Sequence, residues 1–139
     1  MNRTKVKDFM TKEIVAVNPN ESVEKVAQLM VEKKVGSVLV YKDQKNLGII
    51  TKQNIIARVV LNCNDPCTVK AGDIATKNLI TISSEETVKD ALKLMSKYRI
   101  KRIPVINPVS NNLVGIITSY DILAAFNSLE SLSLKSKED

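Results

Sequence analysis

One short segment of the chain has residue types that could hold an anionic ligand, Thr118-Ser-Tyr-Asp121. It follows an apolar β-branched run and precedes a helical pattern, so we expect it at the amino end of a helix. The unpaired N–H groups and the positive dipole end of such a terminus attract phosphate. The Thr118 hydroxyl can donate a further hydrogen bond, and Asp121 presents two acceptor oxygens that suit a pair of hydroxyl groups.

A capping box explains the same residues without a ligand. In that arrangement the Thr118 side chain accepts from the backbone of Asp121, and the Asp121 carboxylate accepts from the backbone of Thr118. Capping boxes are common, so these four residues alone favour the structural role. The internal repeat to which the segment belongs reverses this preference and favours ligand binding.

The segment is half of an internal repeat. Gly48-Ile-Ile-Thr51 followed by Asn54 recurs as Gly115-Ile-Ile-Thr118 followed by Asp121. Two copies are too few for a solenoid, which needs at least about three repeats, and they suit one pseudo-twofold module instead. Further upstream the matched pairs are Asp8 and Asp73, Lys12 and Lys77, Glu21 and Glu86, Val23 and Val88, Leu29-Met30 and Leu94-Met95, and Val40 and Val105.

Each copy predicts the order strand, helix, strand, strand, helix. Ser22 and Thr87 are placed as N-caps, and the apolar residues after them keep the i, i+3, i+4, i+7 spacing of an amphipathic helix. The strands are expected at 14–17, 37–41 and 47–50, then at 79–82, 103–106 and 113–117, and Thr51 and Thr118 open the second helices. We therefore predict a mixed α/β fold with a first repeat at 1–62, a linker at 63–70, a second repeat at 71–129 and a polar, disordered tail at 130–139.

Composition excludes several functions. The chain has 0 His, which removes most acid–base and nucleophilic constellations, so we expect no enzyme activity. Cys63 and Cys67 lack two further ligands for a structural zinc site; we expect two reduced thiols and no metal, although half of an intermolecular metal site stays open.

The net charge is +6, but the basic residues are interleaved with acidic ones and do not form a nucleic-acid-binding stripe. With a polar start and no run long enough for a membrane span, we expect a soluble, cytoplasmic protein.

These motifs together resemble the CBS domain, named after cystathionine β-synthase, and its tandem pair, the Bateman module. The resemblance covers about residues 5 to 128. It rests on Val6-Lys-Asp-Phe-Met-Thr11, the Ser22-Val23 helix start, Arg102-Ile-Pro-Val-Ile106 and the two Gly-Ile-Ile-Thr motifs. One such motif is weak, but two in the correct order with matching spacing are specific.

The resemblance implies two repeats packed sheet to sheet about a pseudo-twofold axis, with two clefts between them. In the family these clefts commonly bind AMP, ADP or ATP, and sometimes S-adenosylmethionine or NAD. The implied role is regulatory, as in energy sensing, with no cofactor required beyond the nucleotide ligand. No second domain is visible in the sequence, so the output is expected to pass through self-association or a separate enzyme or transporter.

The resemblance also assigns residues to a main nucleotide site. Asp121 would bind the ribose, and Thr118, Lys101 and Arg102 would face the phosphates, although a solvated basic edge also explains the two cations. The adenine would lie against Ile14, Val15, Val35 and Gly36 of the opposite repeat, residues that a strand core explains equally well.

A second, weaker site is implied around Thr51 and Asn54. There Asn54 replaces the expected carboxylate, and Gly36-Ser37 replaces the two cations. An amide oxygen lacks the charge that strengthens a hydrogen bond to a hydroxyl. The cleft would be framed by Leu79, Ile80 and Ile100.

Two other functions compete with nucleotide binding. A pure interaction module would leave the clefts empty, and a nucleic-acid-binding protein would use the cluster from Lys97 to Arg102. We further expect a homodimer, because contiguous apolar patches on edge helices usually mark an interface. The helix residues concerned are Val59, Val60, Leu61, Ala125, Phe126 and Leu129.

Overall fold

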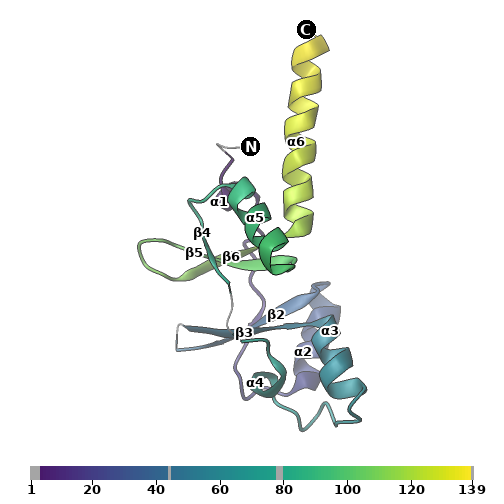
Figure 1. The fold of residues 1–139 in the computed structure, drawn as a ribbon. Coiled ribbons are helices and arrows are strands. Elements are labelled where there is room, and N and C mark those ends of the chain that lie inside the picture. Colours follow the sequence, from purple (N-terminus) through teal and green to yellow (C-terminus); the bar gives the residue numbers. More distant parts are fainter. Residues whose placement is uncertain (1–3, 44, 78–79, 139) are drawn as a thin grey trace. The chain divides into compact units, whose positions relative to one another are not determined.

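The computed structural model describes residues 4–43, 45–77 and 80–138 (Figure 1). The chain divides into two compact units, unit 1 with Met1–Glu13 and Ile80–Asp139, and unit 2 with Ile14–Leu79. Each unit contains one three-stranded sheet. The predicted mixed α/β class with two repeats is confirmed.

Unit 2 builds its sheet in the order β1-β2-β3. β1 pairs parallel to β2, and β2 pairs antiparallel to β3 with Val38 opposite Ile50. The core beneath the sheet is aliphatic, as the composition predicts, and includes Val23, Val26 and Val59. The elements are β1 (Ala16–Val17), α2 (Val23–Lys33), β2 (Ser37–Lys42), β3 (Lys45–Thr51), α3 (Lys52–Ile55), the π-helix η1 (Ile56–Val60) and α4 (Ala71–Ile74).

Unit 1 repeats this plan with the sheet order β4-β5-β6. β4 pairs parallel to β5, and β5 pairs antiparallel to β6 with Ile103 opposite Ile117. Its core is again aliphatic and includes Val6, Val88 and Val105. The elements are α1 (Val6–Phe9), β4 (Ile82–Ser83), α5 (Val88–Tyr98), β5 (Arg102–Ile106), β6 (Leu113–Thr118) and α6 (Ser119–Glu138).

The predicted helix starts are confirmed. The Ser22 hydroxyl accepts from the Lys25 amide, and Thr87 forms a reciprocal capping box with Asp90. Such caps satisfy backbone donors that the first turn of a helix leaves without partners.

In each compact unit, the opening segment of one sequence repeat packs with the rest of the other repeat. The short helices α1 and α4 are absent from the sequence prediction, and α1 packs in unit 1 with the second repeat. Val6 is fully buried there, its amide donates to the Glu86 carbonyl at 2.8 Å, and Thr11 and Ile116 exchange two backbone hydrogen bonds at 2.8 and 3.0 Å. The segment at 4–13 therefore acts as a strap on the second repeat, and the segment after α4 does the same in unit 2.

The straps explain the glycine of each Gly-Ile-Ile-Thr motif. A Cβ atom on Gly115 would lie 2.9 Å from the Thr11 carbonyl oxygen, and one on Gly48 would lie 2.8 Å from the Thr76 carbonyl oxygen. Cβ atoms essentially never approach backbone oxygens so closely. Both glycines are required because backbone crosses directly over the strand.

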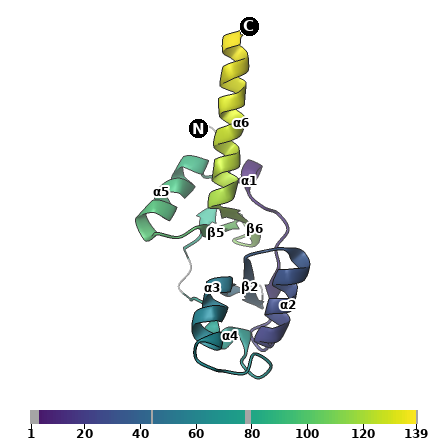
Figure 2. The same ribbon diagram turned by 90° about the vertical axis from the view of Figure 1, so that its right-hand side faces the viewer.

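The helices differ from the sequence prediction in two respects. α6 continues through Glu138, where a disordered tail is predicted from residue 130, and both views show it extending past α1 and α5 of its unit (Figures 1 and 2). Residues 119–138 contain no glycine or proline, and each residue added to an existing helix gains a hydrogen bond. Val59 and Ala125, predicted on an exposed apolar edge, are instead buried in the unit cores.

No helix in the described part of the chain is long and apolar enough to cross a membrane.

The turn after η1 holds the two cysteines, both free and exposed. The Cys67 thiol donates to Glu24 Oε2 at 2.7 Å. This hydrogen bond is the main cause that raises the pKa of Cys67 from its ordinary value of 9.0 to about 11. The thiolate is the reactive form, so Cys67 is held in its unreactive state at neutral pH.

Substituting Val6 should loosen the second repeat rather than the first. Val6→Ala removes two buried methyl groups and should lower the stability of unit 1 by roughly 2 kcal/mol. Hydrogen exchange should then quicken in β5, β6 and the first turns of α6. Val23→Ala, the matched control in the core of unit 2, should quicken exchange in β2 and β3. Faster exchange in β2 and β3 for Val6→Ala would contradict the exchanged arrangement.

The alkylation rate of Cys67 should depend on Glu24. In the wild type the rate should keep rising up to about pH 11, because the pKa of Cys67 is raised to about 11. Glu24→Gln removes the carboxylate, so the midpoint should fall toward the ordinary 9.0 and alkylation at pH 8 should accelerate. Mass spectrometry can follow both thiols, with Cys63 as the internal reference. An unchanged pH profile at Cys67 would show that Glu24 does not control it.

Candidate functional site

The Thr118–Asp121 segment lies where the sequence predicts it, between the end of β6 and the first turn of α6. The Thr118 amide donates to Asp121 Oδ2 at 2.9 Å, and the Asp121 amide donates to Thr118 Oγ1 at 3.1 Å. The capping box is therefore formed. It still leaves the Thr118 hydroxyl hydrogen and further lone pairs of the Asp121 carboxylate for a ligand.

The two predicted cations adjoin this helix start. Arg102 is paired with Thr118 in the β5–β6 ladder, and the Lys101 carbonyl accepts from the Ser119 amide at 2.9 Å. The Lys101 side chain is exposed and that of Arg102 is half-buried. The structure thus brings together all four residues of the predicted main site that belong to unit 1.

Thr11 lies against Asp121, a contact that the sequence does not predict. Its hydroxyl lies 3.4 and 3.3 Å from Oδ1 and Oδ2 of Asp121, because the strap passes over β6 at Ile116. Two features of the sequence point to Thr11: it ends the Val6–Thr11 motif, and it matches Thr76 in the second repeat. Nothing in the local sequence relates Thr11 to Asp121, which lies far along the chain.

The Asp121 carboxylate keeps spare acceptor capacity. Two carboxylate oxygens offer about four lone-pair directions. In unit 1 these oxygens accept from the Thr118 amide and from the Thr11 hydroxyl. About two directions stay open for the hydroxyl groups of a ligand.

Unit 2 contains the equivalent arrangement around Thr51 and Asn54. The Thr51 amide donates to Asn54 Oδ1 at 3.0 Å, and the Asn54 amide donates to Thr51 Oγ1 at 3.2 Å. Ser37 is paired with Thr51 in the β2–β3 ladder, and the Gly36 carbonyl accepts from the Lys52 amide at 3.3 Å. The predicted weaker site therefore has the same backbone frame without the two cations.

The Asn54 side-chain oxygen has no acceptor capacity left. It has two lone pairs. One accepts from the Thr51 amide, and the other accepts from the Thr76 hydroxyl at 3.4 Å. Asn54 can offer a ligand only the N–H donors of its amide group.

The remaining predicted residues are distributed over both units. Ile14, Val15, Val35 and Gly36 belong to unit 2, where Val15 and Val35 pack against the core. Ile80 and Ile100 belong to unit 1, and Ile100 packs against its core. Leu79 lies outside the described residues. The structural role that the sequence allowed for these apolar residues is thus present for Val15, Val35 and Ile100.

Metal chemistry has no candidate among the described residues, which contain no group of three His, Cys, Asp or Glu side chains placed to hold an ion.

Several curated proteins are similar in sequence. An uncharacterized protein of Methanopyrus kandleri is 31% identical over 124 residues, which cover 88% of this chain and 63% of that protein. An inosine-5'-monophosphate dehydrogenase of Korarchaeum cryptofilum is 31% identical over 85% of this chain and 23% of the enzyme. The chain thus spans only part of these two relatives. The CBS domain-containing protein YhcV of Bacillus subtilis is 30% identical over 91% of this chain and 88% of its own length.

Solved structures share the fold. An uncharacterized conserved protein from Pyrococcus horikoshii has a TM-score of 0.81 at 33% identity, covering 90% of this chain and 93% of that one. The CBS domain pair of protein MJ0100, in complex with 5'-methylthioadenosine and S-adenosyl-L-methionine, has a TM-score of 0.79 at 29% identity, covering 90% and 97%. A hexameric CBS-CP12 protein from bloom-forming cyanobacteria has a TM-score of 0.77 at 30% identity, covering 86% and 66%.

The family of the chain follows from the match of both repeats. Residues 6–61 and residues 71–128 each match the CBS domain. These ranges contain both Gly-Ile-Ile-Thr motifs and the capping boxes that follow them. The chain belongs to the CBS-domain family and carries two CBS domains in tandem.

Proposed function

We propose that this CBS pair is a regulatory module that binds one adenine nucleotide, AMP, ADP or ATP, at the Thr118–Asp121 site. The observation that carries the proposal is the Asp121 carboxylate, which keeps acceptor capacity beside two cations at a helix start. In this assignment Asp121 and Thr11 bind the ribose hydroxyls, and Lys101 and Arg102 bind the phosphates. Ligand occupancy would act on a separate enzyme or transporter, or on self-association.

The chemistry of each group suits its assigned partner. A carboxylate accepts from the two neighbouring hydroxyls of a ribose more strongly than a neutral oxygen does. The positive end of the α6 dipole favours phosphate. Arg102 can form a forked pair with phosphate oxygens, and Lys101 adds a point charge.

The family resemblance assigns the adenine ring to Ile14, Val15, Val35 and Gly36, which are apolar or small and suit a flat ring. The MJ0100 pair, which is in complex with the two adenosine-containing ligands named above, supports this ligand class.

The proposal includes an inequality between the two sites. At the Thr51 site the Asn54 oxygen already accepts two hydrogen bonds, and the positions of the two cations hold Gly36 and Ser37. A nucleotide at this site would lack both a ribose acceptor and a phosphate partner of the kind that Arg102 supplies. We therefore propose that any second nucleotide binds much more weakly.

Exchanging the carboxylate and the amide between the sites tests this assignment. Asp121→Asn should keep the capping box, as Asn54 does in unit 2, yet weaken nucleotide binding about ten- to a hundredfold, because a charged hydrogen bond contributes about 1.5 to 3 kcal/mol. Asn54→Asp should strengthen the weaker site, and Asn54→Ala should leave the tight site unchanged. Titration calorimetry with AMP, ADP and ATP measures all three. Tight binding that survives in Asp121→Asn or disappears in Asn54→Ala would refute the site assignment.

We further propose a homodimer that uses exposed apolar residues of α6 and of the end of η1. In unit 2, Val60 is 61% exposed and Leu61, directly after η1, is 72% exposed; in unit 1, Leu123 and Phe126 of α6 are 61% and 41% exposed. Contiguous exposed apolar patches usually mark an interface. The hexameric CBS-CP12 protein shows that a related pair assembles with copies of itself.

Light scattering should report twice the 15.4 kDa mass of the chain at micromolar concentration. Leu123→Glu and Leu61→Glu should shift the mass toward that of a monomer, because each places a charge in the apolar contact. Val109→Glu is the control, since Val109 is 94% exposed in the β5–β6 hairpin and lies outside these helices. A monomeric wild type would exclude the proposed dimer.

A further inference from the structure

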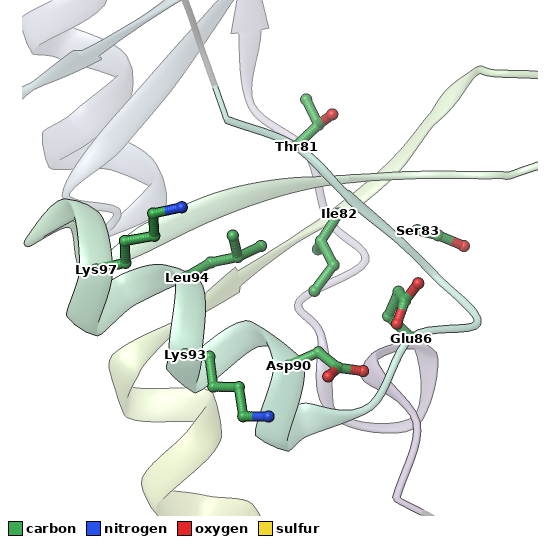
Figure 3. Close-up of a pocket in the computed structure, with 8 residues that line it drawn as sticks. All are labelled: Thr81, Ile82, Ser83, Glu86, Asp90, Lys93, Leu94 and Lys97. Atoms are coloured by element: carbon green, nitrogen blue, oxygen red, sulfur yellow. The ribbon is translucent and has the colours of Figure 1, made fainter.

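A second candidate ligand site lies within unit 1 and shares no residue with either of the two nucleotide sites. It is a hollow of about 390 Å³ between the chain segment at 81–83 and helix α5, here called the β4–α5 hollow (Figure 3). This volume is within the range of small-molecule pockets. Its lining residues are Thr81, Ile82, Ser83, Glu86, Asp90, Lys93, Leu94 and Lys97.

The hollow has an apolar floor, an acidic pair at one end and Lys97 at the other. Lys93, which also belongs to the lining, lies on α5 three residues after Asp90. Ile82, which is 5% exposed, and the half-buried Leu94 form the floor. Figure 3 shows Glu86 and Asp90 together at one end, and Lys97 reaching over the hollow from the other end of α5. Asp90 and Lys97 are seven residues apart on the helix, which corresponds to about 10 Å along its axis.

The carboxylate end is electrostatically suited to a cation. The neighbouring Asp90 carboxyl group raises the pKa of Glu86. Hydrogen bonds from Thr87 hold the pKa of Asp90 below its ordinary value, so Asp90 keeps its charge. A cationic group placed here would relieve the repulsion between the two carboxylates.

The internal repeat shows that the fold does not require these charges. Counted from the N-caps Ser22 and Thr87, the position of Asp90 holds Lys25 in the first repeat, and the position of Lys97 holds Glu32. The floor is retained, because Val17 matches Ile82 and Leu29 matches Leu94. The apolar positions serve the core of both repeats, and Glu86 has its match in Glu21, whereas the charges of Asp90 and Lys97 are particular to the second repeat.

We propose that the β4–α5 hollow binds a basic α-amino acid such as arginine or lysine. The guanidinium or side-chain ammonium would lie at Glu86 and Asp90, the methylene stem over Ile82 and Leu94, and the carboxylate at Lys97. Guanidinium and carboxylate groups form the strongest paired hydrogen bonds.

Charge separates this ligand class from others. A nucleotide would bring several negative charges into a hollow whose two carboxylates balance its two lysines, and only the lysines would attract it. A bare cation would satisfy Glu86 and Asp90 but would gain nothing from Lys97 and the apolar floor. A ligand with a cation and an anion at opposite ends of an apolar stem uses the acidic pair, the floor and Lys97 together.

Titration calorimetry of the full chain with L-arginine and L-lysine tests the proposal. We expect saturable binding of one molecule per chain. L-citrulline has nearly the shape of arginine but a neutral end, and agmatine lacks the carboxylate, so each should bind at least about tenfold more weakly. No saturable binding of L-arginine or L-lysine would overturn the proposal, as would citrulline or agmatine binding equally well.

Matched variants locate the site. Glu86→Gln and Lys97→Gln should each weaken arginine binding by about tenfold or more, because each removes one charged partner. Glu21→Gln and Glu32→Gln, at the same positions of the first repeat, should leave it unchanged. Asp90 is left in place because it caps α5. Asp121→Asn should weaken nucleotide binding without affecting arginine binding. Failure of the nucleotide proposal can therefore be distinguished from failure of the arginine proposal. Equal weakening by the control variants, or none by Glu86→Gln and Lys97→Gln, would overturn the assignment.

Discussion

The backbone crossing between a strap and the Gly-Ile-Ile-Thr strand is the contact on which both units depend. Thr11 exchanges two backbone hydrogen bonds with Ile116, and Thr76 exchanges two with Ile49. Each crossing requires a glycine beneath it, since a Cβ atom on Gly115 or Gly48 would meet the strap within 3 Å. The crossing buries Val6 in unit 1 and places a threonine hydroxyl against the first turn of the following helix.

This arrangement gives the two helix starts nearly the same scaffold and different chemical capacities. Thr11 contacts Asp121, and Thr76 contacts Asn54, each beside a formed capping box. The capping and strap contacts use two acceptor directions in both cases. A carboxylate has further directions to offer, whereas the single oxygen of an amide has none. The replacement of a carboxylate by an amide thus changes which hydrogen bonds a ligand can form, with little effect on the local fold.

The same separation between fold and chemistry recurs at the β4–α5 hollow. The two repeats keep apolar residues where strand and helix meet, because a packed core tolerates little change in volume or polarity. Their exposed positions have diverged, to the extent that a carboxylate in one repeat is an ammonium in the other. A duplicated module can therefore carry unlike sites on like scaffolds, and its lining residues are better guides to function than its core.

The sequence by itself determined the repeat, the α/β class, the helix starts at Ser22 and Thr87, and the grouping of Lys101, Arg102 and Thr118 with Asp121. These features are local or periodic: capping, alternation and helical spacing act over a few residues, so they are visible without coordinates. The extent of α6 beyond residue 129 was missed, because a polar composition does not stop a helix that has already formed. Burial of Val59 and Ala125 was also missed, since an apolar helix residue can face either the core or a partner. The contact of Thr11 with Asp121, the exchange of the straps and the filled lone pairs of Asn54 were decided only by the tertiary structure. They join residues far apart in the chain, and no local propensity encodes which strand a distant segment will cross.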